Sequence, residues 1–251
     1  MNKYLSIITL NVNPLNAPIK SHRVAEWIRK HDSHICCLQE THQEQKTYTD
    51  WKWRVGKKYL RQMHRKKKAG VAILISDKTD FKTNAIKRDT EGHFIKIFKG
   101  RIHQEGIKII NTYAPNIREP KNIRKVLEDF KKDTESNTLT LRDFHITLST
   151  VDRSSKHSIN KDIVTLNNAL DQMDLTDIFR TFRHREAKYT FFSSVHGTFS
   201  KVDHMIRTQN RHQQIEGNWN HVKHFLWPQG ATTRNQPQGK NSKTLKLMEI
   251  E

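Results

Sequence analysis

The sequence predicts a single α/β domain, and three observations lead to this expectation. Short apolar runs of strand length alternate along the chain with amphipathic stretches of helical length. The chain has 251 residues, which is enough to bury one large core. No internal repeat and no Gly/Ser-rich linker interrupts it, but the periodicity stops after Ile206. We therefore expect a structured domain over residues 1–206 and a divergent, poorly ordered tail over residues 207–251.

The first half of the chain predicts three strands and a helix. A β-rich run covers Leu5–Asn13, an amphipathic helix covers Ile19–Lys30, and an apolar strand covers Ile35–Leu38. A loop that ends in the basic run Arg65–Lys68 is expected next, followed by the unbroken apolar run Gly70–Ser76. Such an unbroken run is typical of a strand that is buried on both faces.

The second half predicts five strands and three helices. The expected strands cover His93–Phe98, Gly106–Tyr113, Leu139–His145, Tyr189–Ser193 and Phe199–Ile206, with the last two paired. The expected helices cover Ile117–Lys132, Asp162–Met173 and, as a short turn, Leu175–Phe182.

The composition indicates a polyanionic partner. The chain has 45 Lys and Arg against 26 Asp and Glu, and its formal net charge is +19. Such an excess favours nucleic acid over an anionic membrane surface, because no basic amphipathic helix with a bulky apolar face stands out. No apolar run approaches the ~18 residues of a membrane span either. The N-terminus lacks the pattern of a signal peptide, and the only cysteines, Cys36 and Cys37, are adjacent in an expected core strand. We expect reduced thiols and an intracellular protein, in the nucleus, the cytoplasm or both.

Polar side chains end several of the predicted strands. The set comprises Asn11, Glu40, Asp143 and Asp203, with Tyr113 and Asn116 beside them. If these ends converge, the carboxylates, amides and phenol suit Mg²⁺-assisted phosphodiester hydrolysis, with Glu40 as a metal ligand. Two simpler readings stay open: Glu40 is a solvated strand-end charge, and Asn11 with Asn13 belongs to an ordinary turn.

Seven motifs carry a resemblance to a known family. They are Thr9-Leu-Asn-Val-Asn13, Gln39-Glu-Thr-His42, Lys68–Asp80, Asn111-Thr-Tyr-Ala-Pro-Asn116, Asp152-Arg-Ser154, Tyr189-Thr-Phe-Phe-Ser193 and Ser200-Lys-Val-Asp-His204. In this order and spacing they resemble the endonuclease domain of the mammalian LINE retrotransposon open-reading-frame-two protein, within the endonuclease/exonuclease/phosphatase superfamily. The resemblance extends from Leu5 to Ile206.

This resemblance implies a four-layer αββα sandwich and Mg²⁺-dependent nicking of one DNA strand, the step that primes reverse transcription. By motif match, Glu40 would hold the metal with Asn11 close by, Tyr113 and Asp143 would support the phosphate and leaving group, and Asp203 would orient a histidine. The DNA contacts would be Asn116, Arg153, Thr190, Ser200 and Val202. We expect a monomer, with the reverse transcriptase supplied only in trans.

The chain departs from the family pattern at its catalytic end. Arg142 and His145 stand where the family has Gly and Asn, and the family's later Ser-Asp-His is absent. The corresponding region reads His224–Gly230, so we expect the last core strand to be missing as well. Loss of a general base costs ~10²–10⁴-fold in rate. The sequence therefore predicts a divergent or decayed copy with impaired activity, in which His145 is the first candidate for a replacement base.

Three other functions remain open from the sequence. The first is a nucleic-acid-binding remnant without catalysis, which would bind DNA in a salt-sensitive and sequence-tolerant way. The second is a translated fragment that never folds stably. The third is a phosphatase for small phosphates, which the net charge of +19 disfavours.

Overall fold

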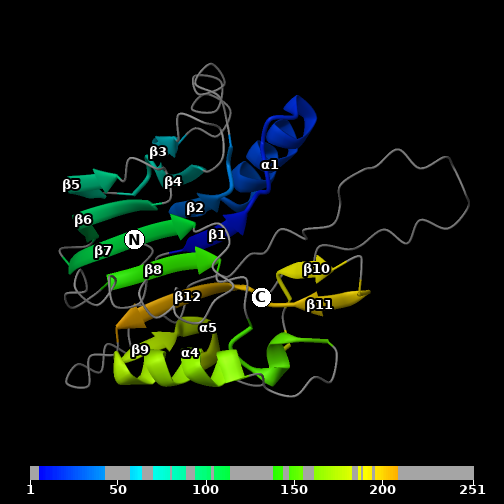
Figure 1. The fold of residues 1–251 in the computed structure, drawn as a ribbon. Coiled ribbons are helices and arrows are strands. Elements are labelled where there is room, and N and C mark those ends of the chain that lie inside the picture. The colour runs from blue at the N-terminus through cyan, green and yellow to red at the C-terminus, as the bar shows by residue number, and fades with distance from the viewer. Residues whose placement is uncertain are drawn as a thin grey trace, which may run out of the picture.

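The described part of the chain packs in four layers, helix on sheet on sheet on helix (Figure 1). The structure is a computed structural model, and it describes residues 6–42, 57–63, 70–79, 81–88, 94–102, 105–113, 138–143, 147–154, 161–182, 186–187, 189–193 and 196–208. This arrangement confirms the predicted αββα sandwich. None of the described helices is long and apolar enough to cross a membrane.

The first sheet has the strand order β1-β2-β4-β3. Its strands are β1 (Ile7–Asn11), β2 (Ile35–Gln39), β3 (Lys57–Met63) and β4 (Gly70–Ser76). β1 and β2 are parallel, because α1 (Pro18–His31) carries the chain back between them, and the other pairs are antiparallel. Both parallel strands therefore end at the same edge of the sheet.

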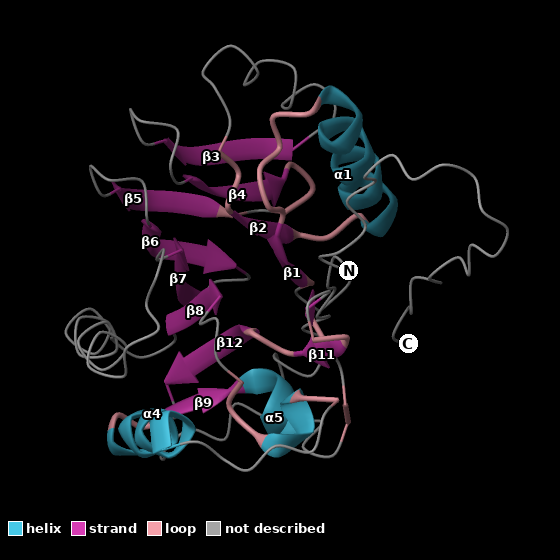
Figure 2. Cartoon of the chain, turned by 45° about the vertical axis from the view of Figure 1, so that its right-hand side comes forward, coloured by secondary structure: helices cyan, strands magenta, loops and turns pink. Residues whose placement is uncertain are grey.

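The helix α1 covers the outer face of the first sheet (Figure 2). It begins at Pro18, a residue that suits the first helical turn, and it ends at Asp32 in the left-handed conformation. Its buried face packs on alternate residues of β1, β2 and β4, and the helical members of this cluster are Val24, Ala25, Trp27 and Ile28.

The second sheet has the strand order β5-β6-β7-β8-β12-β9. Its strands are β5 (Lys82–Arg88), β6 (Phe94–Ile102), β7 (Glu105–Tyr113), β8 (Thr138–Asp143), β9 (Leu175–Asp177) and β12 (Asp203–Thr208). Only β7 and β8 are parallel. The helix α4 (Lys161–Gln172) packs on the outer face through Leu166, Ala169 and Leu170, and a short helix, α5 (Ile178–Phe182), follows β9.

The inner faces of the two sheets bury the main apolar cluster. Its members from the first sheet are Ile7, Ile35, Cys37, Val71, Ile73 and Ile75, and those from the second sheet include Ile107, Ile109, Tyr113, Leu139, Leu141 and Met205. Cys36 lies on the opposite face, under α1, as the alternation of a strand requires. Both cysteines are free and buried, as predicted, and burial, with the neighbouring Cys36, raises the pKa of Cys37.

The structure corrects the expected elements in three places. Leu175–Asp177 is a strand rather than the start of a helix, because it pairs with β12. Phe199–Ile206 is not one strand: β11 (Thr198–Ser200) pairs with β10 (Phe191–Ser193), and β12 pairs with β8 and β9. The strands β3 and β5 were not expected. The predicted helix Ile117–Lys132 lies outside the described residues, as do all of residues 209–251, so the tail and its missing strand stay predictions.

A buried polar junction joins the two sheets near their carboxyl ends. The Gln39 amide at the end of β2 hydrogen-bonds the Thr9 hydroxyl of β1 and donates to Asn111 Oδ1 of β7 at 2.8 Å. Asn111 Nδ2 donates to the carbonyl oxygens of Leu38 at 3.0 Å and Ala72 at 2.8 Å. These side chains are fully buried, so each polar group depends on the others for its hydrogen bonds.

A second buried polar cluster fixes the start of β12. The Asp177 carboxylate accepts hydrogen bonds from Lys201 Nζ and His204 Nδ1, both at 2.8 Å. The Lys201 and His204 side chains are both completely buried. Burial alone would raise the pKa of Asp177, but the Lys201 ammonium and the His204 ring hold that pKa well below its usual range. The backbone N–H of Lys201 also donates to the carbonyl of Asp152 at 2.8 Å, which ties this segment to a neighbouring loop.

Replacing Asn111 by Leu should destabilise the fold by ~2–4 kcal/mol, because it leaves the buried Gln39 amide and two carbonyl groups without their partner. Urea unfolding measures this change as a lower midpoint. The matched control is Asn168→Leu on the exposed face of α4, which should stay within ~0.5 kcal/mol of the wild type. Equal stability of the two variants would contradict the junction's importance.

Asp177→Asn should cost ~3–5 kcal/mol near pH 7, because it leaves the Lys201 and His204 side chains buried beside a neutral group. The depressed pKa adds a pH signature. Its contribution is complete above the unfolded-state pKa of ~3.9 and is lost as the pH falls toward the lower folded value. Thermal unfolding between pH 3 and 7 should show this acid-sensitive part in the exposed control Asp171→Asn and not in Asp177→Asn.

Candidate functional site

The carboxyl ends of β1 and β2 bring the first two predicted site residues together. Asn11 is paired in register with Gln39, so the next residue, Glu40, leaves the sheet beside it. Asn11 Nδ2 donates a hydrogen bond to Glu40 Oε1 at 2.8 Å. Asn11 is buried and Glu40 is half-buried, which leaves part of the carboxylate open to a ligand. Two of the predicted site residues, Asn11 and Glu40, are therefore in direct contact at the strand ends.

Backbone strain is concentrated at this edge. Five non-glycine residues in the described segments have positive φ, and three of them are Asn13 (40°), Glu40 (54°) and His42 (44°). Asn tolerates this conformation, but for Glu and His it costs ~1 kcal/mol or more. Asn13 is held by its own N–H, which donates to Asn11 Oδ1 at 3.0 Å. Strain that the surrounding fold supports is typical of functional sites.

The loop that carries Glu40 is fastened on both sides. The N–H of Thr41 donates to the carbonyl of Gly70 at 3.0 Å, and the N–H of Leu15 donates to the carbonyl of Thr41 at 3.1 Å. A Cβ atom at Gly70 would lie 2.5 Å from Thr41 Oγ1 and 3.1 Å from the backbone nitrogen of His42. The first residue of β4 therefore has to be glycine for this loop to pack as it does.

His42 connects this loop to the second sheet. Its ring lies edge-on to Tyr113, with 6.5 Å between the ring centroids. Its Nε2 atom is buried and makes no hydrogen bond with the described part of the chain. Burial lowers the pKa of His42, and the nearby Glu40 carboxylate only partly offsets this. The His42 imidazole thus lines the site next to a phenol, and it is not among the predicted site residues.

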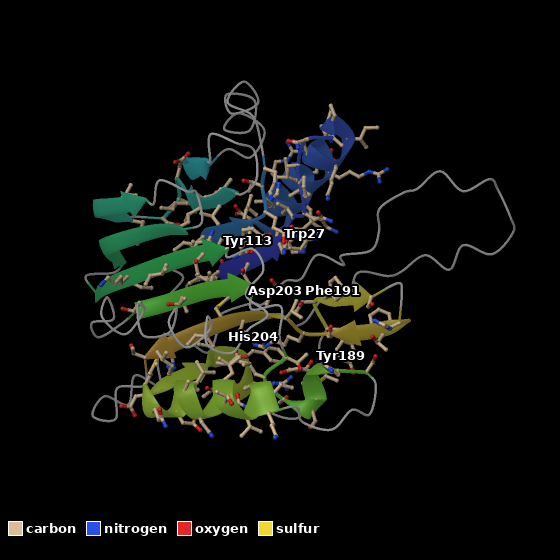
Figure 3. All side chains as sticks on the ribbon, in the orientation of Figure 1. Trp27, Tyr113, Tyr189, Phe191, Asp203 and His204 are labelled. Atoms are coloured by element: carbon tan, nitrogen blue, oxygen red, sulfur yellow. The ribbon has the colours of Figure 1, made fainter. Side chains whose placement is uncertain are left out.

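Tyr113, Asp143 and Asp203 lie in register across three neighbouring strands. Tyr113 of β7 pairs with Asp143 of β8, which pairs with Asp203 of the antiparallel strand β12. Figure 3 shows Tyr113 and Asp203 at the same end of the sheets. Tyr113 and Asp203 are buried, whereas only the backbone of Asp143 is described. The second sheet therefore supplies a phenol and a carboxylate at the edge where the first sheet presents Glu40.

The hairpin β10–β11 lies next to Asp203 and is attached to it through Thr190. Thr190 Oγ1 accepts hydrogen bonds from the N–H groups of Val202 at 2.9 Å and Asp203 at 3.3 Å. The N–H of Thr190 donates to the carbonyl of Ser200 at 2.8 Å. Because Thr190 is buried, its hydroxyl positions its two neighbours; a direct contact with DNA stays a prediction.

Arg153 forms an exposed corner beside the same hairpin. It makes an isolated β-bridge with Ser200, and its chain neighbour Asp152 is completely buried. The Asp152 carboxylate pairs with Arg180 and accepts two backbone N–H groups, from Leu148 at 3.1 Å and from Ser149 at 2.9 Å. These interactions fix the loop, so the Arg153 guanidinium extends from a rigid base.

Aromatic side chains also surface on this hairpin. Tyr189 stacks on Phe199 with 6.0 Å between ring centroids, and Phe191 and Phe199 are each 38% exposed. Figure 3 places Tyr189 and Phe191 beside the strand end that carries Asp203. Exposed aromatic rings beside an arginine offer stacking as well as charge to a ligand.

The structure describes nine of the eleven predicted site residues, at least by their backbone. Asn116 and His145 lie outside the described residues, and their place in the site stays a prediction. Lys20 was not predicted. Its ammonium donates to the carbonyl of Asn13. Burial lowers the pKa of Lys20, and the Glu40 carboxylate only partly offsets this. No residue pattern indicates this contact, because it joins a helix to the loop before it.

The described donors suit a hard divalent cation held mainly by Glu40. Within the described segments, no group of three or more His, Cys, Asp and Glu side chains is placed to hold a metal ion. Mg²⁺ needs no such cage, because it often takes one or two carboxylates and fills its shell with water and phosphate oxygens. The half-buried Glu40 carboxylate, oriented by Asn11, offers such a position.

The fold and family of the chain agree with this geometry. It is similar to the AP endonuclease LMAP from Leishmania major (TM-score 0.62, 15% identity, 82% of this chain and 79% of that chain). It is also similar to an AP endonuclease from Archaeoglobus fulgidus and to the Neisseria 3' phosphatase NExo bound to a product DNA hairpin, each with a TM-score of 0.61, 20% identity, and coverage of 80% of this chain and 86% of that chain. Residues 8–140, more than half of the sequence, match the model of the Endonuclease/Exonuclease/phosphatase family. The chain therefore belongs to the endonuclease/exonuclease/phosphatase family.

Proposed function

We propose that this chain is, by descent, a LINE-type DNA endonuclease that retains a DNA-binding strand-end site and has lost most of its hydrolytic activity. The observation that carries the proposal is the Glu40 carboxylate, which Asn11 holds at the ends of two parallel strands. Tyr113 lies across from it on the second sheet, in contact with the His42 ring. The LINE origin is supported by the seven sequence motifs, most of which include residues of this edge, of the adjoining hairpin or of the Arg153 loop.

Glu40 is the residue that would hold Mg²⁺ in this proposal. When bound, the metal would supply positive charge that stabilises a phosphodiester as its phosphorus becomes five-coordinate. Asn11 holds the carboxylate in place, and its Oδ1 is in turn fixed by the N–H of Asn13. Tyr113 and Asp143 would support the phosphate and the leaving oxygen, and Asp203 lies beside them in the sheet.

DNA is the substrate that the surface beside this site favours. Arg153, Ser200 and Val202 would contact it, since they adjoin Asp203 on a hairpin and loop fixed by buried interactions. Asn116 and Thr190 belong to the same proposed contact set. A net charge of +19 gives the chain a strong general attraction for a polyanion. The product DNA hairpin in the similar Neisseria phosphatase is in keeping with this choice.

The proposed impairment depends on what the sequence lacks. No Asp follows Asp203 in the chain, so no Asp-His pair supplies a general base and phosphate donor at the family's spacing. General-base catalysis contributes ~10²–10⁴-fold, and one oxyanion donor contributes a further ~10²–10³-fold. His145 in place of Asn adds to this loss and is also the group best placed in sequence to substitute as a base.

The same site supports a second candidate, a DNA-binding remnant without catalysis. The Arg153 corner and the hairpin are held by Asp152, Arg180 and Thr190 and do not depend on Glu40. Binding could therefore survive after hydrolysis is lost. Under either function, the structured domain covers residues 1–206, the protein acts as a monomer inside the cell, in the nucleus or cytoplasm, and a reverse transcriptase would act only in trans.

Nicking of supercoiled plasmid by the purified chain tests the proposal. With Mg²⁺, the rate should stay close to that in EDTA, while the same protein should bind duplex DNA in a salt-sensitive way. Glu40→Ala should remove any residual Mg²⁺-dependent nicking. The exposed Glu26→Ala on α1 is the matched control and should leave that rate unchanged.

Robust nicking that needs both Mg²⁺ and Glu40 would contradict the impairment and make His145 the first base to test. Nicking that survives in Glu40→Ala would contradict the proposed site itself. If nicking is absent but DNA is bound and the protein melts cooperatively, the binding remnant is the better account. Absence of a cooperative melt would contradict both functions.

A further inference from the structure

We propose that Lys20 is a phosphate-binding residue of this site. Its ammonium would contact the DNA backbone beside the Glu40 carboxylate. This inference rests on the proposed function, because it names a further contact of the same site. It concerns a residue of α1 that lies outside the seven motifs and has no assigned role.

Lys20 is joined to Glu40 by a continuous chain of hydrogen bonds. Its Nζ donates to the carbonyl of Asn13, the N–H of Asn13 donates to Asn11 Oδ1, and Asn11 Nδ2 donates to Glu40 Oε1. All three links involve Asn13 or Glu40, the residues at the strand ends that have positive φ. The ammonium is therefore placed at the site by the same residues that orient the carboxylate.

Lys20 also keeps hydrogen-bonding capacity for a ligand. An ammonium group has three donors, and Asn13 accepts from it through a single carbonyl oxygen. The side chain is only half-buried, so its remaining donors can be reached from solvent. A phosphodiester bound at Glu40 would bring anionic oxygens into the neighbourhood of this cation, and a lysine is a common point charge for such oxygens.

Helix stability does not explain a lysine at this position. Lys20 lies in the first turn of α1, which contains no acidic residue. A cation there opposes the helix dipole and is unfavourable for the helix. The last turn, in contrast, carries Arg29, Lys30 and His31, where cations are favourable. The position of Lys20 is thus better explained by its neighbours Asn13 and Glu40 than by the stability of the helix.

The salt dependence of DNA binding tests this role. Fluorescence anisotropy with a labelled duplex should give a straight line of log K against log salt for the wild type. Lys20→Gln should weaken binding and reduce the magnitude of that slope by ~0.9, the value for one lost phosphate contact. Lys20→Arg should restore the slope. Lys30→Gln, the same change at the far end of the same helix, should leave it unchanged.

The possible results separate this inference from the proposed function. If the wild type binds DNA with a steep slope and Lys20→Gln has the slope of Lys30→Gln, the Lys20 contact is wrong and the DNA site stands. If Lys20→Arg fails to restore the slope, the lysine acts through the loop and not through its charge, which also overturns the inference. If the wild type shows no salt-dependent binding, the proposed function and the Lys20 contact both fail. Circular dichroism melts of all four proteins identify any variant that has merely unfolded.

Discussion

The hydrogen-bonded junction between Gln39 and Asn111 holds the two sheets together beside the site. It crosses from one sheet to the other inside an otherwise apolar interface, and every polar group in it is buried. Apolar packing alone would allow the sheets to slide, whereas paired amides have one satisfied arrangement. Gln39 immediately precedes Glu40, and Asn111 lies two residues before Tyr113. The junction thus fixes the distance between the two halves of the site.

Near this junction the backbone adopts unfavourable conformations at the residues of the site. Positive φ values at Glu40 and His42, and a glycine that permits the close approach of β4, shape a short loop with little freedom. The Asp177 cluster has the same effect on the other side, because it anchors Lys201 between two residues of the proposed DNA surface. Rigid support of this kind suits a site that must hold a phosphodiester in one orientation.

The sequence predicts the continuously apolar strands well and misses three strands at the edges of the sheets, for a physical reason. Gly70–Ser76 was predicted with its observed bounds because it is buried on both faces and is continuously apolar. The unexpected strands β3 and β5 each lie at an edge of a described sheet, and so does β9, for which the sequence predicts a helix. Edge strands often carry charged residues that discourage aggregation, which removes the apolar alternation. The sequence predicts Glu40 as a site residue because a polar residue follows an apolar run of strand length there. The contact from Lys20 to Asn13 arises only from the tertiary fold.

In the proposed function, this chain descends from an active endonuclease but has lost most of the hydrolytic activity. The strand-end site would bind DNA in either case. In the proposed function, the carboxyl ends of β1 and β2 and the start of β12 form one DNA-binding surface. Hydrogen–deuterium exchange with and without duplex DNA tests it most directly, because it needs no catalysis. DNA should slow exchange in peptides containing residues 10–15, 39–42 and 198–204 together, while peptides from α4 should be unaffected. Protection confined to other segments, with these three unchanged at saturating DNA, would contradict it.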